Sequence, residues 1–255
     1  EAAFFPALTL LDQEPSRSVG ILYIGPLKAL INDQFQRLEG LMRDAHIPVW
    51  HWHGDVPQSE KTKVMRNPSG VLQITPESLE GLLMNKPNAI PALFGDLRYI
   101  VVDEVHAFMG VDRGVQVLAQ LSRIQRMAGC RPQRIGLSAT LSDYESACAW
   151  LSSDTGQPVE VVSPQGSRKL RLSVEHFSFP DARNEEQAQQ LEYAQQAYHN
   201  FIYDQTHHKK ALIFTNSRSD AEYLTLEMRR VAAKRQEPDI FHVHHGSISA
   251  MLREE

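Results

Sequence analysis

The sequence predicts an α/β fold with two domains in tandem, each built around a parallel sheet. Short apolar runs alternate with longer stretches that carry apolar residues at helical spacing, which is typical of strands joined by crossover helices. The length of 255 residues suits one or two domains. The stretch SPQGS at 163–167 has the composition of a linker. We therefore expect one domain at 1–165 and a second at 166–255.

The first domain is expected to alternate strands and helices along its whole length. Its strand candidates are short, mostly apolar runs, as the buried strands of a parallel sheet require. They lie at 21–24, 49–52, 71–74, 99–102, 134–137 and 159–162. Between them, apolar residues recur at the spacing of a helix face over 28–43, 59–66, 76–84, 113–127 and 143–151.

The second domain is expected to repeat this plan with fewer elements. Alternating apolar residues predict a strand over 170–179, and a Gln- and Glu-rich helix is expected to follow from residue 184 to about residue 203. A buried strand at 211–214, a helix at 220–234 and a strand at 240–244 complete the pattern. These are too few strands to close a domain, so we expect the second domain to be truncated at its C-terminal end.

Composition excludes several classes of protein. Hydrophobic residues make up 42% and charged residues 22% of the chain, which excludes whole-chain disorder, collagen and coiled coil. No apolar run is long enough for a membrane span or resembles a signal peptide, so we expect a cytoplasmic protein without a membrane partner. The net charge of −5 argues against one broad basic face. It still permits a nucleic-acid strand to be held by backbone amides, hydroxyls and a few Lys or Arg residues.

Two adjacent acids, Asp103 and Glu104, follow the strand expected at 99–102. Ligands of open α/β sheets bind beyond the carboxyl ends of the strands. Asp103 is therefore a candidate ligand of Mg²⁺, usually through water, and Glu104 a candidate base for the attacking water in phosphoryl transfer. An isolated acid pair more often begins a solvated loop or caps a helix, so this motif alone leaves both interpretations open.

A second motif, LSATL at 137–141, follows the next expected strand. Ser138 and Thr140 place two hydroxyls at the same sheet edge as the acids, and the small Ala139 between them allows the loop to pack closely. Such hydroxyls can bond a carboxylate or an imidazole at the neighbouring strand end, which would couple nucleotide state to loop position. Capping of the helix that begins near Asp143 explains the motif equally well when it is taken alone.

Together these motifs resemble those of superfamily 2 helicases, the DEAD/DEAH-box class. DEVH at 103–106 resembles motif II, and SAT at 138–140 resembles motif III. Four further matches keep the family's order: GPLKALINDQ at 25–34, TPE at 75–77, ALIFTNSR at 211–218 and HHGS at 244–247. PLKAL, the Arg113–Gly114 pair and HHGS followed by Ile-Ser are most similar to the Lhr, or large helicase-related, group. RecQ-like and Ski2-like helicases share some of these motifs.

The resemblance implies two RecA-like domains that bind ATP and Mg²⁺ in the cleft between them and hold a nucleic-acid strand across their top. It implies that Asp103 holds Mg²⁺ and that Glu104 acts as the catalytic base. His106 would link the hydrolysis site to the coupling motif of Ser138, Ala139 and Thr140. A histidine at such a position is otherwise a plain core or loop residue.

Strand-binding residues are expected at the same edge, because helix N-termini that follow strands offer amides to phosphate. Taken singly, such residues are more often helix caps. The candidates are Pro26, Lys28, Asn32, Gln34, Gly54, Thr75, Pro76, Glu77 and Arg113 in the first domain and Thr215, Asn216, Ser217, Arg218, His245, Gly246 and Ser247 in the second. The expected partner is single-stranded or partially duplex DNA or RNA.

Aromatic and histidine side chains alternate in WHWHGD at 50–55 and invite two interpretations. They could stack on bases, but alternation along a strand points either Trp50 with Trp52 or His51 with His53 into the core, so packing is favoured. Strand alternation and the absence of accompanying cysteines likewise argue against a metal cluster among the histidines of 207–208 and 242–245.

The sequence departs from the family pattern at both ends. A helicase needs a Gly-rich phosphate loop ending in GK[ST] before GPLKAL, and no glycine of this chain is followed by lysine. The strand and helix that carry the last motifs would lie beyond Glu255. We therefore expect an internal fragment whose first domain lacks its P-loop strand. It would not hydrolyse ATP efficiently alone, although its parent would.

Three functions are compatible with these motifs. The first is an ATP-dependent helicase or translocase, for which the resemblance to Lhr proteins implies 3′-to-5′ movement and a role in DNA repair or nucleic-acid processing. The second is a nucleic-acid-stimulated ATPase that remodels without strand separation. The third is a catalytically silent binding module, against which the presence of both Asp103 and Glu104 counts.

Overall fold

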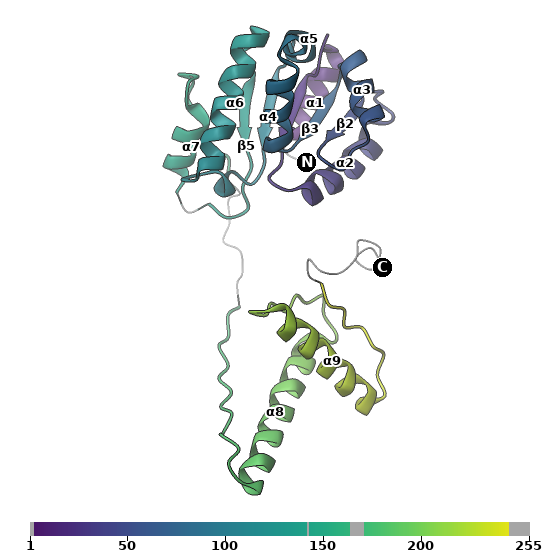
Figure 1. The fold of residues 1–255 in the computed structure, drawn as a ribbon, viewed down its shortest axis with the longest axis vertical. Coiled ribbons are helices and arrows are strands. Elements are labelled where there is room, and N and C mark those ends of the chain that lie inside the picture. The colour runs from purple at the N-terminus through teal and green to yellow at the C-terminus, as the bar shows by residue number, and fades with distance from the viewer. Residues whose placement is uncertain (1–2, 142, 164–170, 245–255) are drawn as a thin grey trace. The chain divides into compact units, whose positions relative to one another are not determined.

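The structure is a computed structural model that describes residues 3–141, 143–163 and 171–244. The chain divides into two compact units, Glu1–Gln165 and Gly166–Glu255 (Figure 1). None of the helices in the described ranges is both long and apolar enough to cross a bilayer.

A five-stranded parallel sheet forms the centre of unit 1. Its strands are β1 (Ile21–Ile24), β2 (Val49–Trp52), β3 (Val71–Ile74), β4 (Tyr99–Val102) and β5 (Gln133–Gly136), in the order β2-β3-β1-β4-β5. The register aligns the strand ends, since Ile24 pairs with both Ile74 and Val102. All five strands therefore deliver the residues that follow them to one edge of the sheet.

Helices cover both faces of this sheet (Figure 1). They are α1 (Phe4–Gln13), α2 (Lys28–Met42), α3 (Gln58–Arg66), α4 (Pro76–Asn85), α5 (Ile90–Phe94), α6 (Asp112–Ala128) and α7 (Tyr144–Ser152). Two short 3₁₀ turns, Pro87–Ala89 and Val105–Ala107, also occur. Ile21 and Tyr23 of β1 pack beneath α1 and α2. Leu22 and Ile24 face the core formed with α3 to α6. Because both faces are covered, every side chain of β1 is buried, which explains its continuous apolar run.

Unit 2 contains two helices, α8 (Glu185–Thr206) and α9 (Arg218–Arg235), in its described part. Asn184 caps α8 and Ser217 caps α9, each by accepting a hydrogen bond from a backbone amide of the first turn. The two helices pack through a small apolar cluster of Tyr203, Leu224, Met228 and Ala232.

The strand predictions hold for the sheet of unit 1 and are wrong elsewhere. The first four strands have the predicted bounds, and β5 begins one residue before the predicted start at 134. Residues 159–162, 171–179, 211–214 and 240–244 form no strand in the part of the chain that the structure describes; residue 170 lies outside it. A strand requires a paired neighbour for its backbone groups, and apolar alternation alone does not supply one. Leu212 and Phe214 accordingly remain 86% and 89% exposed.

Candidate functional site

The acid pair lies where β4 ends, beside the end of β1. The backbone amide of Asp103 donates to the Ile24 carbonyl at 3.0 Å, so the ladder between the two strands extends to the acid. The Asp103 carboxylate is held on both oxygens. Oδ1 accepts a 2.9 Å hydrogen bond from the Glu104 amide, and Oδ2 accepts one from the Tyr23 hydroxyl. The carboxylate is therefore fixed at the sheet edge.

Glu104 adopts a left-handed backbone conformation, with φ 50° and ψ 51°. This conformation is unusual for a residue with a side chain, and such strain is concentrated at functional sites. One carboxylate oxygen, Oε2, is buried and has no hydrogen-bond partner among the described residues. A buried acceptor of this kind is costly unless something occupies it. The geometry therefore suits a carboxylate that receives a water or substrate hydrogen.

His106 bridges the acid pair and the loop after β5. Its Nδ1 lies 2.8 Å from Ser138 Oγ and 3.3 Å from Glu104 Oε2. The hydrogen bond to Ser138 joins residues 32 positions apart in the sequence. A change at the acid pair can thus reach the loop after β5 through one imidazole.

The backbone reinforces this bridge. The Leu137 amide donates to the Val102 carbonyl, and the Val105 amide donates to the Leu137 carbonyl, both at 2.9 Å. Ser138 Oγ also donates to the Thr140 carbonyl at 3.3 Å. Thr140 thus takes part through its backbone, while Ala139 is exposed. The predicted proximity of the DEVH and SAT segments is present in this geometry.

The residues at this edge fit a nucleotide with Mg²⁺. Asp103 keeps lone pairs beyond those used by Tyr23 and Glu104. No group of three or more potential metal ligands occurs in the described residues. Mg²⁺ is commonly held by one or two carboxylates together with waters and substrate phosphates, so Asp103 could serve as its protein ligand. The second feature that fits such a substrate is Glu104 Oε2, which accepts no hydrogen bond from any residue that the structure describes.

Tyr23 is not among the site residues predicted from the sequence. This tyrosine is fully buried within β1, and its hydroxyl contacts a carboxylate 80 positions away in the sequence. Burial, followed by the hydrogen bond to Asp103, raises the pKa of Tyr23. The phenol is therefore a permanent donor to the acid. One signal was available: a phenol within the apolar strand ILYI needs a hydrogen-bond partner.

The N-terminus of α2 places two of the predicted strand-binding residues at this edge. Lys28 Nζ donates to both oxygens of Asp55 at 2.9 and 3.1 Å, and this hydrogen bond is the main cause of the lowered pKa of Asp55. Asn32 Oδ1 lies 2.8 Å from Nε2 of the buried His53. Gly54 lies next to Lys28, since a Cβ there would be 3.3 Å from Nζ. The Lys28 ammonium, the Asn32 amide and the backbone of Gly54 are thus grouped at the sheet edge, in the segments that follow β1 and β2.

The tryptophans of β2 face the core, and packing is confirmed for them. Trp52 is buried in the cluster beneath α3 to α6, and Trp50 packs against that cluster while its Nε1 donates to the Ser69 carbonyl at 3.0 Å. His51 and His53 lie on the other face, where the His51 ring packs against Phe35 in a tilted arrangement with centroids 4.1 Å apart.

The first turn of α4 holds the predicted Thr75, Pro76 and Glu77. Thr75 caps the helix by accepting a 3.4 Å hydrogen bond from the Ser78 amide, so its hydroxyl has a structural task. The carbonyl of Pro76 accepts a hydrogen bond from Gln120 at 2.9 Å. Glu77 accepts a 2.8 Å hydrogen bond from Arg113 Nε.

Gln34 is not brought to this group. Its side chain lines a small cleft with residues of α1, among them Phe4, and with Leu38 of its own helix. Helical spacing turns position 34 away from the face that carries Lys28 and toward the α1 side of the sheet.

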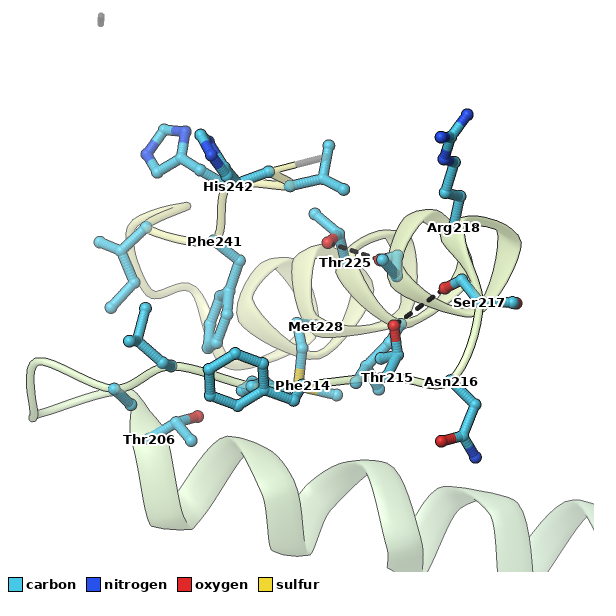
Figure 2. Close-up of a pocket in the computed structure, with 18 of the residues that line it drawn as sticks. Thr206, Phe214, Thr215, Asn216, Ser217, Arg218, Thr225, Met228, Phe241 and His242 are labelled. Atoms are coloured by element: carbon cyan, nitrogen blue, oxygen red, sulfur yellow. Dashed lines mark hydrogen bonds between the residues drawn. The ribbon is translucent and has the colours of Figure 1, made fainter. Parts of the chain in front are cut away.

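In unit 2, the predicted residues lie on the turn into α9 (Figure 2). Thr215 Oγ1 donates to the Ser217 carbonyl at 2.9 Å, and Ser217 Oγ caps the helix. Asn216 is exposed, and Arg218 begins α9. This turn borders an open cavity of about 670 Å³ between α9 and the extended segments before and after it. His245, Gly246 and Ser247 lie outside the described residues.

Comparison with known proteins places this geometry in a family. The family model for the DEAD/DEAH box helicase matches residues 1–147, which include β1 to β5 and the loops that carry the acid pair. The chain belongs to the DEAD/DEAH box helicases. The resemblance to this class, and within it to the Lhr group, is confirmed.

Lhr proteins are prominent among the relatives of this helicase chain. It is 31% identical over 249 residues to the Lhr helicase and probable uracil glycosylase of Mycolicibacterium smegmatis, covering 92% of this chain and 16% of that protein. It is also 31% identical over 257 residues to the ATP-dependent helicase Lhr-Core of Methanothermobacter thermautotrophicus, covering 95% and 29%. The chain thus spans less than a third of each of these relatives.

A solved structure supports the same assignment. Mycobacterium smegmatis helicase Lhr bound to ssDNA and AMP-PNP matches with a TM-score of 0.73 and 28% identity, over 99% of this chain and 33% of that one. The predicted fold class, an α/β protein of the RecA-like helicase type, is thereby confirmed.

Proposed function

We propose that this chain forms part of an ATP-dependent helicase or translocase that couples ATP hydrolysis to movement along DNA or RNA. In this proposal, units 1 and 2 correspond to the first and second RecA-like domains. ATP and Mg²⁺ would bind at the edge that carries Asp103 and Glu104. In unit 1, a single strand would contact the residues at the N-termini of α2 and α4. In unit 2, taken by itself, the turn into α9 is the candidate strand contact.

The observation that carries this proposal is the position of His106 between Glu104 and Ser138. Its Nδ1 lies 3.3 Å from Glu104 Oε2, a buried oxygen without a hydrogen-bond partner among the described residues, and 2.8 Å from Ser138 Oγ. A buried carboxylate oxygen that lies beside an imidazole and makes no hydrogen bond within the described residues suits an acceptor for a substrate water. A hydrolysis site linked to a loop that moves explains both contacts.

The residues of the site have separate tasks in this mechanism. Bound Mg²⁺ would supply charge neutralisation for the phosphates of ATP. Asp103, fixed by Tyr23 and by the Glu104 amide, holds its carboxylate toward that position. Glu104 orients the attacking water and accepts its proton. His106, which contacts both Glu104 and Ser138, would transmit a change at the acid to the loop after β5.

Lys28 and the helix N-termini would meet the strand. Lys28 Nζ is half exposed and paired with the exposed Asp55, and an ion pair so open to solvent is weak. A phosphate can therefore replace Asp55 at little cost. The amides at the first turns of α2 and α4 would add hydrogen bonds and the favourable end of the helix dipole.

The test is ATP hydrolysis by the full-length natural product that contains these residues, with and without single-stranded DNA or RNA. Glu104→Gln keeps the shape of the side chain and removes the base, so we expect ATP to bind while turnover falls by orders of magnitude. Glu145→Gln, which removes an acid from the first turn of α7, is the matched control and should retain turnover.

The outcomes separate the three functions. Strand-stimulated turnover that depends on Glu104, together with strand separation, supports the helicase. Turnover without separation indicates a translocase or remodelling ATPase. Strand binding without any turnover in the wild type indicates a silent binding module, and normal turnover in Glu104→Gln removes our assignment of the base.

A further inference from the structure

Arg113 joins three segments of unit 1 that are far apart in the sequence. Its Nε donates to Glu77 Oε1 at 2.8 Å, and its Nη2 donates to the backbone carbonyl of Pro26 at 2.8 Å. Its guanidinium also lies over the Phe108 ring, with Cζ 5.5 Å from the centroid. These partners belong to the turn before α2, the first turn of α4 and the loop after the acid pair.

The backbone that carries Arg113 is itself fixed against that loop. The neighbouring Gly114 packs so closely that a Cβ there would lie 1.7 Å from the Phe108 carbonyl oxygen. Phe108 is fully buried and stacks on Trp150 with centroids 6.3 Å apart. The guanidinium thus projects from a rigid base, and its planar fork can hold two acceptors at a defined separation.

The two acceptors of Arg113 lie at the starts of two helices. Pro26 stands two residues before Lys28, where α2 begins. Glu77 lies in the first turn of α4. Although partial burial raises the pKa of Glu77, the hydrogen bond from Arg113 is the next cause and the pKa is lowered overall. The carboxylate is therefore kept charged as a partner for the guanidinium.

We propose that Arg113 is a positioning residue that holds the N-termini of α2 and α4 at the separation a nucleic-acid strand requires. It acts through Pro26 and Glu77 and not through contact with the strand. This inference rests on the strand interface proposed above, and it replaces the direct contact expected for Arg113 and Glu77 from the sequence.

The charge of Glu77 gives the sharpest test. Removal of a carboxylate from a surface that binds phosphates should strengthen binding if electrostatics alone decides the outcome. If Glu77 holds Arg113 in place, its removal weakens binding instead. We expect Glu77→Ala to raise the dissociation constant for a fluorescent single-stranded oligonucleotide about tenfold, within the range seen when a residue acts through another.

Glu80→Ala is the matched control. Glu80 lies one turn further along α4 and also pairs with α6, through Arg123 at 2.6 Å. The variant removes the same charge and breaks an ion pair between the same two helices, but away from the strand ends. Its strand affinity should stay at the wild-type level. Thermal melts of each variant establish that it is folded.

Arg113→Lys separates positioning from direct contact. Lysine keeps the positive charge but has no planar fork, so it cannot reproduce the two hydrogen bonds. We expect Arg113→Lys to bind as weakly as Arg113→Ala. Near wild-type binding by Arg113→Lys would show that its charge meets the strand directly and would overturn the proposal.

All affinities are measured with the full-length protein, on DNA and RNA oligonucleotides, at two salt concentrations. A wild type that binds neither strand defeats the proposed interface and this inference with it. A wild type that binds, together with Glu77→Ala binding equally well or more tightly, leaves the interface intact and overturns the role of Arg113 alone.

Discussion

The hydroxyl of Tyr23 donates a hydrogen bond to Oδ2 of Asp103, across neighbouring strands β1 and β4. The ring lies beneath α1, 5.7 Å from the Phe4 ring, and is completely buried. Because the phenol is held by the core, the position of the carboxylate is set by the sheet and not by a mobile loop. A tyrosine of the core thereby fixes the position of a candidate Mg²⁺ ligand at the sheet edge.

Replacement of Tyr23 by phenylalanine should raise the Mg²⁺ requirement of the full-length protein. Tyr23→Phe keeps the ring and removes the donor, so Asp103 loses one of its two fixed hydrogen bonds. We expect the Mg²⁺ concentration for half-maximal ATP turnover to rise severalfold. Tyr99→Phe, at the opposite end of β4, is the control and should leave it unchanged. An unaltered Mg²⁺ titration in Tyr23→Phe would show that the phenol does not position the acid.

Loss of the His106 side chain should uncouple hydrolysis from movement. His106→Ala removes the bridge to Ser138 but leaves Asp103 and Glu104 in place. We expect strand separation to fall several times more than ATP turnover, and Ser138→Ala to shift the same ratio. This ratio is measured by assaying strand separation and ATP turnover on the same protein preparation. Equal proportional losses would assign His106 to the chemical step.

Gly114→Ala should destabilise unit 1 strongly, because its Cβ would lie 1.7 Å from the Phe108 carbonyl oxygen. Relief of such an overlap moves backbone, and overpacking of this kind costs about 1–3 kcal/mol. Gly40→Ala is the control, since nothing lies within 4 Å of a Cβ there and the exposed helical site should gain about 0.5–1 kcal/mol. Urea unfolding of the 255-residue chain measures both. Equal midpoints for the two variants would contradict the close approach.

Unit 1 should lose stability as the pH falls below about 6.5, the ordinary pKa of histidine. His53 is buried, and burial, followed by the nearby His51, lowers the pKa of His53 in the folded state. The unfolded chain then binds more protons than the folded one between the lowered pKa and the ordinary one, so stability rises with pH through that window and is complete above it.

The measurement is urea unfolding at several pH values between about 5 and 8, a window that brackets the ordinary histidine pKa. His53→Gln removes one titrating group while it keeps a polar partner for Asn32, and it should reduce the slope. His51, whose pKa is also lowered by burial, contributes the remainder. The slope contributed by one such proton cannot exceed about 1.4 kcal/mol per pH unit. A variant with the same slope as the wild type would place the pH dependence elsewhere.

The sequence predicts the sheet of unit 1 well because its strands are buried on both faces. A continuous apolar run such as ILYI at 21–24 is expected for a strand that helices cover on both faces, and all four of its residues are buried. Segments of similar character in unit 2, such as 211–214, form no strand in the described part of the chain. Apolar character is a local property, whereas pairing depends on a partner elsewhere in the chain.

The candidate site could be predicted only in part, for the same reason. Strand order and the parallel sheet bring the DEVH and SAT segments together, and both could be found from motifs. The contact of Tyr23 with Asp103 and that of Arg113 with the Pro26 carbonyl span 80 and 87 positions. Sequence spacing alone does not predict contacts between residues so far apart in the chain. Thr75 shows the reverse case, since its hydroxyl proved to be a helix cap.

The left-handed conformation of Glu104 has a consequence for how this position tolerates change. A residue with a side chain at φ 50° costs roughly 1–3 kcal/mol, whereas glycine or asparagine adopts that conformation far more readily. The fold alone would therefore favour glycine at 104. An acid there costs folding free energy, so stability-guided redesign of this domain would tend to replace the residue that we propose as the base.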